Sequence, residues 1–127
     1  MPGSAVAVTD SLLVQLRKGV LDMCVLAMLA QRDGYAYDIA SRLADGIGMG
    51  EGTIYPLMRR MQADGLVKTY LEESSSGPPR KYYQLTRAGH AALAAQQAEW
   101  STFVTSVAKV LSDAKPATTA KTAGAGR

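Results

Sequence analysis

Apolar residues recur with a helical period in four parts of this chain. Residues 12–30 are dense in Leu, Val, Met and Ala and contain only three charges, so we expect a helix that is buried on more than one side. A shorter helix is expected over residues 37–44. In residues 51–65 one apolar face repeats at intervals of three and four positions, and a last helix is expected over residues 86–113, with Thr86 as its N-cap.

Two shorter stretches have the composition of strands. Residues 66–73 and 80–85 are rich in Val, Leu, Thr and Tyr, and six Ser, Gly and Pro residues at 74–79 separate them. Turn-forming residues between two strand-like stretches predict a β-hairpin.

The start of the third helix is harder to place, because Pro56 lies inside its apolar pattern. Proline lacks a backbone donor and is tolerated best at the first position of a helix. Local propensity therefore places the start at Pro56, with Tyr55 as an unfavourable N-cap. A Gly-rich turn over residues 45–50 precedes this helix.

The order of these elements predicts a mainly α-helical fold, a winged helix-turn-helix of three helices and a two-stranded β-wing, followed by a long C-terminal dimerisation helix. Two helices joined by a short Gly-containing turn, and then a hairpin, are typical of this fold. We expect a flexible arm at 1–10, the DNA-binding domain at 11–85, the dimerisation helix at 86–113 and a disordered tail at 114–127. The tail consists of Ala, Thr, Lys and Gly with one Pro and one Arg, a composition that cannot form a core.

The last helix is too long for the domain before it to cover. It would extend about 42 Å, and apolar residues recur along one side of it every seven positions. We therefore expect this seam to lie in an interface with a partner helix. The seam consists of Leu93, Gln97, Trp100, Val104, Val107 and Leu111.

The net charge of +3 is not spread evenly along the chain. Three basic residues and no acidic one follow Ala114, so the rest of the chain is neutral. Residues 53–90, by contrast, contain six basic and three acidic residues. Such a local excess of positive charge is typical of a surface that binds nucleic acid.

The composition argues against an enzyme or a metalloprotein. One His and one Cys allow neither a nucleophile–base–orienter triad nor a disulfide framework or a Cys-based zinc site within one chain. The Gly-rich turn lacks the ending of a phosphate loop. The longest apolar run is far shorter than the about 20 residues of a membrane helix. The first nine residues carry no Lys or Arg, so we expect no secretory leader. We expect a cytoplasmic protein without a cofactor, a metal or a membrane anchor.

Seven residues are candidates for contact with double-stranded DNA. In this fold the third helix enters the major groove and the wing touches the flanking backbone. The hydroxyls of Thr53 and Tyr55 suit phosphates or base edges, Arg59 suits guanine, and Gly52 lets a phosphate approach the backbone. Three further candidates are Arg60, for a phosphate, and Arg80 and Lys81, for a phosphate or the minor groove. The alternative interpretation is a solvated helix face and an edge strand that its charges protect from aggregation.

Two stretches of the chain resemble the signature of PadR-like transcriptional regulators. The first is residues 52–61 (GTIYPLMRRM) with 64–67 (DGLV), and the second is residues 77–86 (GPPRKYYQLT) followed by Gly89. Residues 37–39 (YDI) resemble the family's short second-helix motif, although the family often has Gly at the preceding position. The resemblance extends from residue 12 to about residue 111 and is to the family's short subclass.

The resemblance implies a dimeric repressor that is paired through its first and last helices, and a third helix that begins near Glu51. The symmetry of a dimer predicts a near-palindromic operator. In some relatives a Trp of the last helix lines an apolar pore between subunits, where planar drug-like or aromatic ligands bind. The corresponding effector site would contain Trp100, Phe103, Glu99, Met23 and Met28.

We therefore expect a sequence-specific DNA-binding transcriptional regulator, a homodimeric repressor that a small planar aromatic effector releases from DNA. The alternative is a winged-helix protein-interaction module without specific DNA binding. A strong dependence of DNA binding on salt separates the two interpretations.

Overall fold

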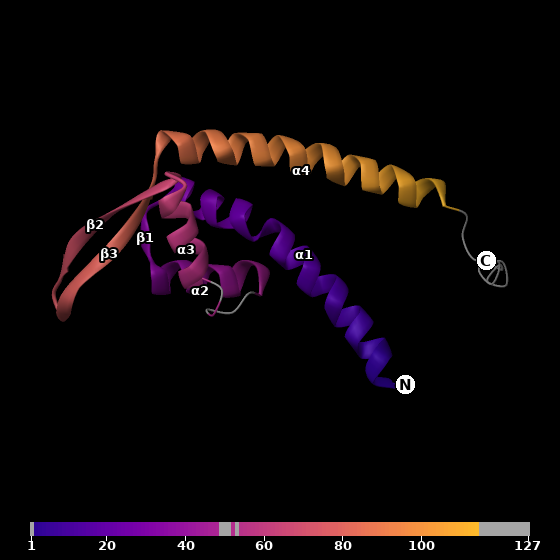
Figure 1. Ribbon diagram of the computed structural model, residues 1–127, viewed down its shortest axis with the longest axis horizontal. Helices are drawn as coiled ribbons and strands as arrows, with labels where there is room; N and C mark the ends of the chain where they lie inside the picture. The colour runs from indigo at the N-terminus through magenta and orange to yellow at the C-terminus, as the bar shows by residue number, and fades with distance from the viewer. Residues whose placement is uncertain (1, 49–51, 53, 115–127) are drawn as a thin grey trace. The chain divides into compact units, whose positions relative to one another are not determined.

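A computed structural model describes residues 2–48, 52 and 54–114 of the chain. Within these residues it confirms the mainly helical fold with a β-wing (Figure 1). The elements are α1 (Pro2–Gln31), β1 (Gly34–Tyr35), α2 (Ala36–Ile47), α3 (Ile54–Ala63), β2 (Val67–Ser74), β3 (Gly77–Leu85) and α4 (Arg87–Asp113). The chain divides into two compact units, Met1–Ala95 and Gln96–Arg127. None of the helices in the described ranges combines the length and the hydropathy that a membrane crossing requires.

The core of the first unit forms where the apolar faces of the helices meet one face of the sheet. Helices α2 and α3 each bury a face with three- and four-residue spacing, which is the pattern that their sequences predict. Burying a large aliphatic side chain stabilises the fold by about 1.5–3 kcal/mol. The largest fully buried side chains are Leu26, Ile39, Leu43, Ile54, Met58, Met61 and Val25.

Helix α1 begins at Pro2, so residues 2–10 belong to this helix and do not form the flexible arm expected from the sequence. Proline is favoured at the first helical position, because the N–H that it lacks has no partner there. Further along, α1 buries Leu21, Val25 and Leu29 in the core of the first unit.

Helix α2 runs past Ala44, its expected end, to Ile47. It ends at Gly48, which has φ +70° and whose N–H donates to the carbonyl of Ala44 at 3.1 Å. Glycine adopts this left-handed conformation without strain and commonly ends helices in this way. Asp45 and Gly46, assigned to a Gly-rich turn from the sequence, are therefore helical.

Helix α3 begins at Ile54, before Pro56, so the start expected from propensity is wrong. Pro56 lies in the first turn of the helix, where backbone N–H groups have no intrahelical partner, and it therefore breaks no hydrogen bond. Glu51, near which the family resemblance places the start, lies outside the described residues.

Strands β2 and β3 form the predicted hairpin and pair in antiparallel register over the length of β2. The turn contains only Ser75 and Ser76, so β3 begins at Gly77 and not at Arg80. The two prolines after Gly77 lie at an irregularity in the pairing, where the missing N–H of proline is tolerated.

A third strand, β1, was not predicted from the sequence. Gly34 and Tyr35 pair antiparallel with Tyr83 and Tyr82, which gives the strand order β1-β3-β2. A strand of two residues has no alternation that a pattern could reveal. It matters for function because it brings Tyr35 beside the wing.

Thr86 caps helix α4, as predicted. Its Oγ1 accepts a hydrogen bond from the N–H of Gly89 at 3.0 Å and donates one to the carbonyl of Gly65 at 2.7 Å. Close to this cap, Leu93 is buried in the core of the first unit. Leu93, which the seven-residue pattern assigned to the partner interface, therefore packs within its own chain.

Candidate nucleic-acid interface

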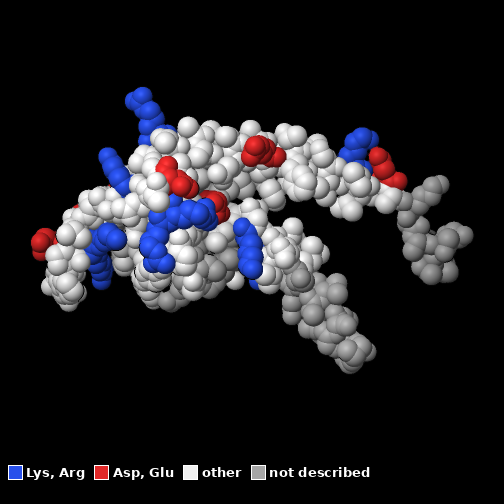
Figure 2. All heavy atoms as spheres, in the orientation of Figure 1, with Lys and Arg blue, Asp and Glu red and all other residues white. Residues whose placement is uncertain are grey.

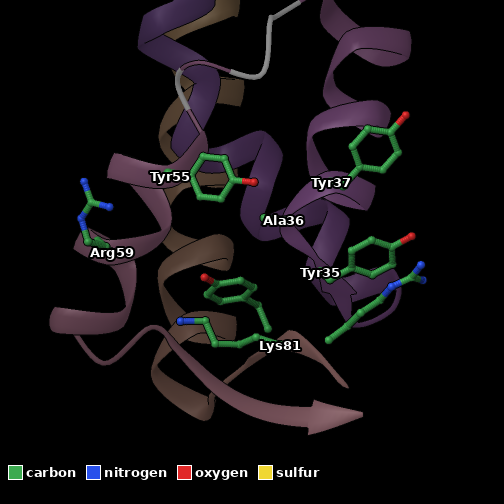
Figure 3. A pocket seen from close by; sticks show the side chains of 8 residues that line it. Tyr35, Ala36, Tyr37, Tyr55, Arg59 and Lys81 are labelled. Atoms are coloured by element: carbon green, nitrogen blue, oxygen red, sulfur yellow. The ribbon is translucent and has the colours of Figure 1, made fainter. Parts of the chain in front are cut away.

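An open hollow of about 410 Å³ lies among the start of α2, helix α3 and the wing. In Figure 3, Tyr55 and Arg59 of α3 lie on one side of it, Tyr35 and Tyr37 lie opposite, and Lys81 lies between them. The lining residues are Tyr35, Ala36, Tyr37, Tyr55, Arg59, Arg80, Lys81 and Tyr83. Three of these lining residues are basic and none of them is acidic, so the hollow attracts anions.

Helix α3 presents Tyr55 and Arg59 to this hollow because its other face is in the core. The two residues are four positions apart and therefore lie one turn apart on the same side of the helix. Both are exposed, Tyr55 by 54%. The hydrophobic pattern predicted this orientation. The buried side of α3 consists of Ile54, Leu57, Met58 and Met61.

Arg80 and Lys81 reach the hollow from β3. The guanidinium carbon of Arg80 lies 4.6 Å from the centre of the Tyr35 ring, and Nζ of Lys81 lies 5.7 Å from the centre of the Tyr83 ring. A cation held over an aromatic ring keeps N–H groups free for an anion. The sequence placed both basic residues at the tip of the wing, but the tip is Ser75–Ser76 and the two residues lie beside the helices.

Arg60 does not line the hollow. Its guanidinium forms two hydrogen bonds with the carboxylate of Asp22 on α1, at 2.9 and 3.2 Å. The sequence suggested a phosphate contact for Arg60, but the structure gives its charge a partner within the chain. Figure 2 shows that acidic side chains lie next to part of the basic surface of the first unit.

Two further predicted contacts precede α3. Gly52 is exposed, and no atom lies within 4 Å of the position that a Cβ would occupy, which leaves the space that a close backbone approach needs. Gly52 is not among the residues that line the hollow. Thr53 lies outside the described residues.

Three tyrosines of the hollow, Tyr35, Tyr37 and Tyr83, were not among the residues that the sequence predicted to contact DNA. Tyr37 was counted among the apolar positions of its helix, but its side chain is 64% exposed. Tyr35 belongs to β1, a strand that the sequence pattern does not predict. The family motif at residues 37–39 is the one feature that points to Tyr37.

Asp33, between α1 and β1, forms hydrogen bonds with both strands of the wing near its base. Its Oδ2 accepts hydrogen bonds from the hydroxyl of Tyr70 at 2.6 Å and from Nε2 of Gln84 at 3.2 Å. The hydrogen bond to the Asp33 carboxylate raises the pKa of Tyr70 to about 12, because the negative charge favours the protonated phenol.

We expect Asp33→Asn to lower the pKa of Tyr70 from about 12 toward its ordinary value of about 10. The pKa of Tyr70 is higher in the folded chain than in the unfolded chain. The contact with Asp33 therefore stabilises the fold below about pH 10, and this contribution is lost as the pH rises to about 12. The measurement is the ultraviolet absorbance of phenolate during an alkaline titration. Tyr70→Phe is the control, since it removes the late-ionising group altogether. A late transition that persists in Asp33→Asn would show that the hydrogen bond is not its cause.

The residues predicted to bind an effector lie in two different units. Met23 and Met28 of α1 are half-buried and pack against the core of the first unit. Glu99, Trp100 and Phe103 belong to the second unit and are exposed on α4. None of the five lines the hollow beside α3.

Comparison with known proteins gives a family match over the part of the chain that contains the hollow. Residues 25–95 match the transcriptional regulator PadR-like family. A crystal structure of a PadR family transcriptional regulator from Eggerthella lenta is 35% identical to the chain, with a TM-score of 0.79. The match covers 87% of this chain and 98% of that one.

Two further relatives are similar to the chain. The crystal structure of a PadR-like transcriptional regulator from Bacillus cereus is 37% identical, has a TM-score of 0.71, and is matched over 80% of this chain and 99% of its own. An uncharacterized protein from Lysinibacillus sphaericus is 28% identical over 88 residues, which are 66% of this chain and 81% of the relative.

Proposed function

The chain belongs to the PadR-like family of transcriptional regulators, and from this premise we propose that it is a homodimeric repressor whose α3 and wing bind a near-palindromic operator. The family is one of DNA-binding regulators and not of enzymes, so the chain is a DNA-binding transcriptional regulator. A dimer bound at a promoter represses by blocking access to it.

The observation that carries the proposal is the hollow between α3 and the wing. Basic side chains from both elements converge on it, and none of its lining residues is a carboxylate. Lys and Arg contacts to phosphates supply the salt-dependent part of DNA affinity. In a winged helix-turn-helix this arrangement puts α3 in the major groove and the wing on the neighbouring backbone.

Within this interface each side chain has a role that its chemistry suits. Arg59 bonds O6 and N7 of guanine together, because a guanidinium presents parallel donors. Tyr55, one turn away, donates its hydroxyl to a phosphate or a base edge. Arg80 and Lys81 contact phosphates beside the groove. Gly52 and Thr53, which precede α3 in the sequence, are two further predicted contacts with DNA.

Two exposed apolar stripes support the homodimer. On α1, Leu12, Leu13 and Leu16 are exposed, and the second unit exposes a larger stripe along α4. Large uncovered apolar surfaces mark interaction sites, and the seven-residue spacing on α4 suits a second helix. The α4 stripe consists of Trp100, Phe103, Val104, Val107, Val110 and Leu111. A two-fold dimer would place two α3 helices in successive major grooves, about 34 Å apart.

The test is fluorescence anisotropy with a duplex from the region upstream of the chain's own gene, with a scrambled duplex as the control. We expect tight, selective binding by two chains per duplex, with log K falling by about 0.9 per phosphate contact for each tenfold rise in salt. Sedimentation velocity measures the dimer in parallel. Equal and weak binding to both duplexes would contradict the proposal and favour a winged-helix module that contacts proteins.

We further propose that a small planar aromatic ligand releases the dimer from DNA through a site that contains Trp100. A ligand that prefers a different spacing of the two α3 helices weakens DNA binding by the ratio of its affinities for the two states. Trp100 is the only Trp of the chain, so its emission reports on this site alone. We expect members of a panel of planar aromatics to quench this emission and to lower operator affinity. Emission that no member of the panel changes would contradict the proposal.

A further inference from the structure

One face of the sheet carries a row of three tyrosines, one from each strand. Tyr35 of β1 and Tyr70 of β2 are both register partners of Tyr82 in β3, and register partners project from the same face of a sheet. The rings of Tyr70 and Tyr82 are stacked, with centroids 5.7 Å apart and planes inclined by 18°. Tyr35 meets Tyr82 edge to face, with centroids 5.4 Å apart.

Each end of this tyrosine row is attached to a charged side chain. At the β2 end the Tyr70 hydroxyl donates to Asp33 at 2.6 Å. At the β1 end the guanidinium carbon of Arg80 lies 4.6 Å from the centre of the Tyr35 ring. Direct contacts thus connect a carboxylate at the base of the wing with a basic side chain that lines the hollow.

Arg80 needs such a support to point into the hollow. An exposed arginine has many rotamers, and it loses this freedom when it binds a phosphate. In addition, the register partner of Arg80 on β2 is Glu72, whose carboxylate competes for the guanidinium. Among the ion pairs of the described residues there is no Arg80–Glu72 pair. The Tyr35 ring holds the guanidinium on the side of the hollow instead.

We propose that the tyrosine row, anchored by Asp33, positions Arg80 for a phosphate of the DNA backbone. Tyr35, Tyr70, Tyr82 and Asp33 are then positioning residues, which act on DNA binding through Arg80. The inference rests on the proposed function, because the contact that the row prepares is a contact with DNA.

The test compares the salt dependence of DNA binding in variants of the full chain. Arg80→Ala removes one phosphate contact from each protomer of the dimer, so the slope of log K against log salt becomes shallower by about 1.8, which is about sixtyfold weaker binding at 0.1 M salt. The loss is expected to be equal on the operator and on the scrambled duplex. Tyr82→Leu is expected to change the slope in the same way, although it removes no charge. The double variant is expected to bind no more weakly than Arg80→Ala alone, because both changes remove the same contact.

Two further variants separate positioning from stability. Tyr70→Phe keeps all three rings and removes only the hydrogen bond to Asp33, so we expect a loss of about threefold on both duplexes with an intact fold. Val67→Ala lies on β2 but in the core, and it is expected to lower the melting temperature without changing the slope.

The outcomes distinguish this inference from the proposed function. If Arg80→Ala makes the slope shallower but Tyr82→Leu and Tyr70→Phe leave DNA binding unchanged, the tyrosine row does not position Arg80, while the DNA-binding function stands. An unchanged slope in Arg80→Ala would mean that there is no phosphate contact to position, and the inference fails. If the wild-type chain binds neither duplex, the proposed function fails and the inference fails with it.

Discussion

Replacing Arg59 with alanine is expected to weaken binding to the operator by roughly thirtyfold or more, because the dimer loses one guanine contact from each protomer, and binding to a scrambled duplex much less. A bidentate contact with guanine discriminates against the wrong base by about 1–3 kcal/mol. Arg59 is exposed on α3 and lines the hollow, so its removal leaves the core intact. Anisotropy titrations on both duplexes at one salt concentration measure the two losses.

The matched control for this prediction is Arg60→Ala, on the same helix. Arg60 is held by Asp22 at 2.9 and 3.2 Å and does not line the hollow. We expect its replacement to lower the free energy of unfolding by at most about 1 kcal/mol, as for an exposed ion pair, and to leave operator selectivity unchanged. Equal losses on both duplexes in Arg59→Ala would reassign Arg59 to the phosphates. A shallower salt slope in Arg60→Ala would show that Arg60 contacts a phosphate after all.

Replacing Gly89 with alanine is expected to destabilise the fold by about 3 kcal/mol, because the added methyl group overfills a closed space. A Cβ at this position would overlap the carbonyl oxygen of Leu66 and lie 2.6 Å from Cδ1 of Leu85. The same glycine donates its N–H to the cap at Thr86, so relief of the overlap would also disturb the start of α4. For a domain of this size the melting temperature should fall by about 15 °C.

Gly19→Ala is the control for this change. Gly19 lies within α1, and a Cβ there meets no atom within 4 Å. Alanine in place of glycine inside a helix stabilises by about 0.5–1 kcal/mol, so this variant should melt slightly above the wild type. Melting is compared at equal protein concentration, since the stability of a dimer depends on it. If Gly89→Ala melts at the same temperature as the wild type, the space around this glycine is not closely packed and the prediction is wrong.

Much of the fold can be predicted from the chain because it depends on short-range pattern. The spacing of apolar residues sets which side of α3 is buried, and it follows that Tyr55 and Arg59 face outward. The cap at Thr86 and the hairpin likewise depend on residues close to one another along the chain. Local propensity gave the wrong helix start where a residue is tolerated at two positions of a helix. Pro56 is tolerated both at the start of a helix and later in its first turn, and α3 uses the second.

The composition of the hollow, by contrast, depends on contacts between distant residues. Asp33 is 37 residues from Tyr70 and 51 from Gln84, and Arg60 is 38 from Asp22. No periodicity links such pairs, so the charge of Arg60 looks available in the sequence although Asp22 neutralises it in the fold.

The sequence therefore specifies which elements form and which of their faces are apolar, because both depend on neighbours within a turn or a hairpin. It does not specify that a two-residue strand brings Tyr35 beside Tyr82, that Leu93 packs in the core of its own chain, or that Arg80 lies over an aromatic ring. These features arise only when the helices and strands pack against one another. Side chains with similar local sequence patterns then differ in whether they are buried and in which distant residue they contact.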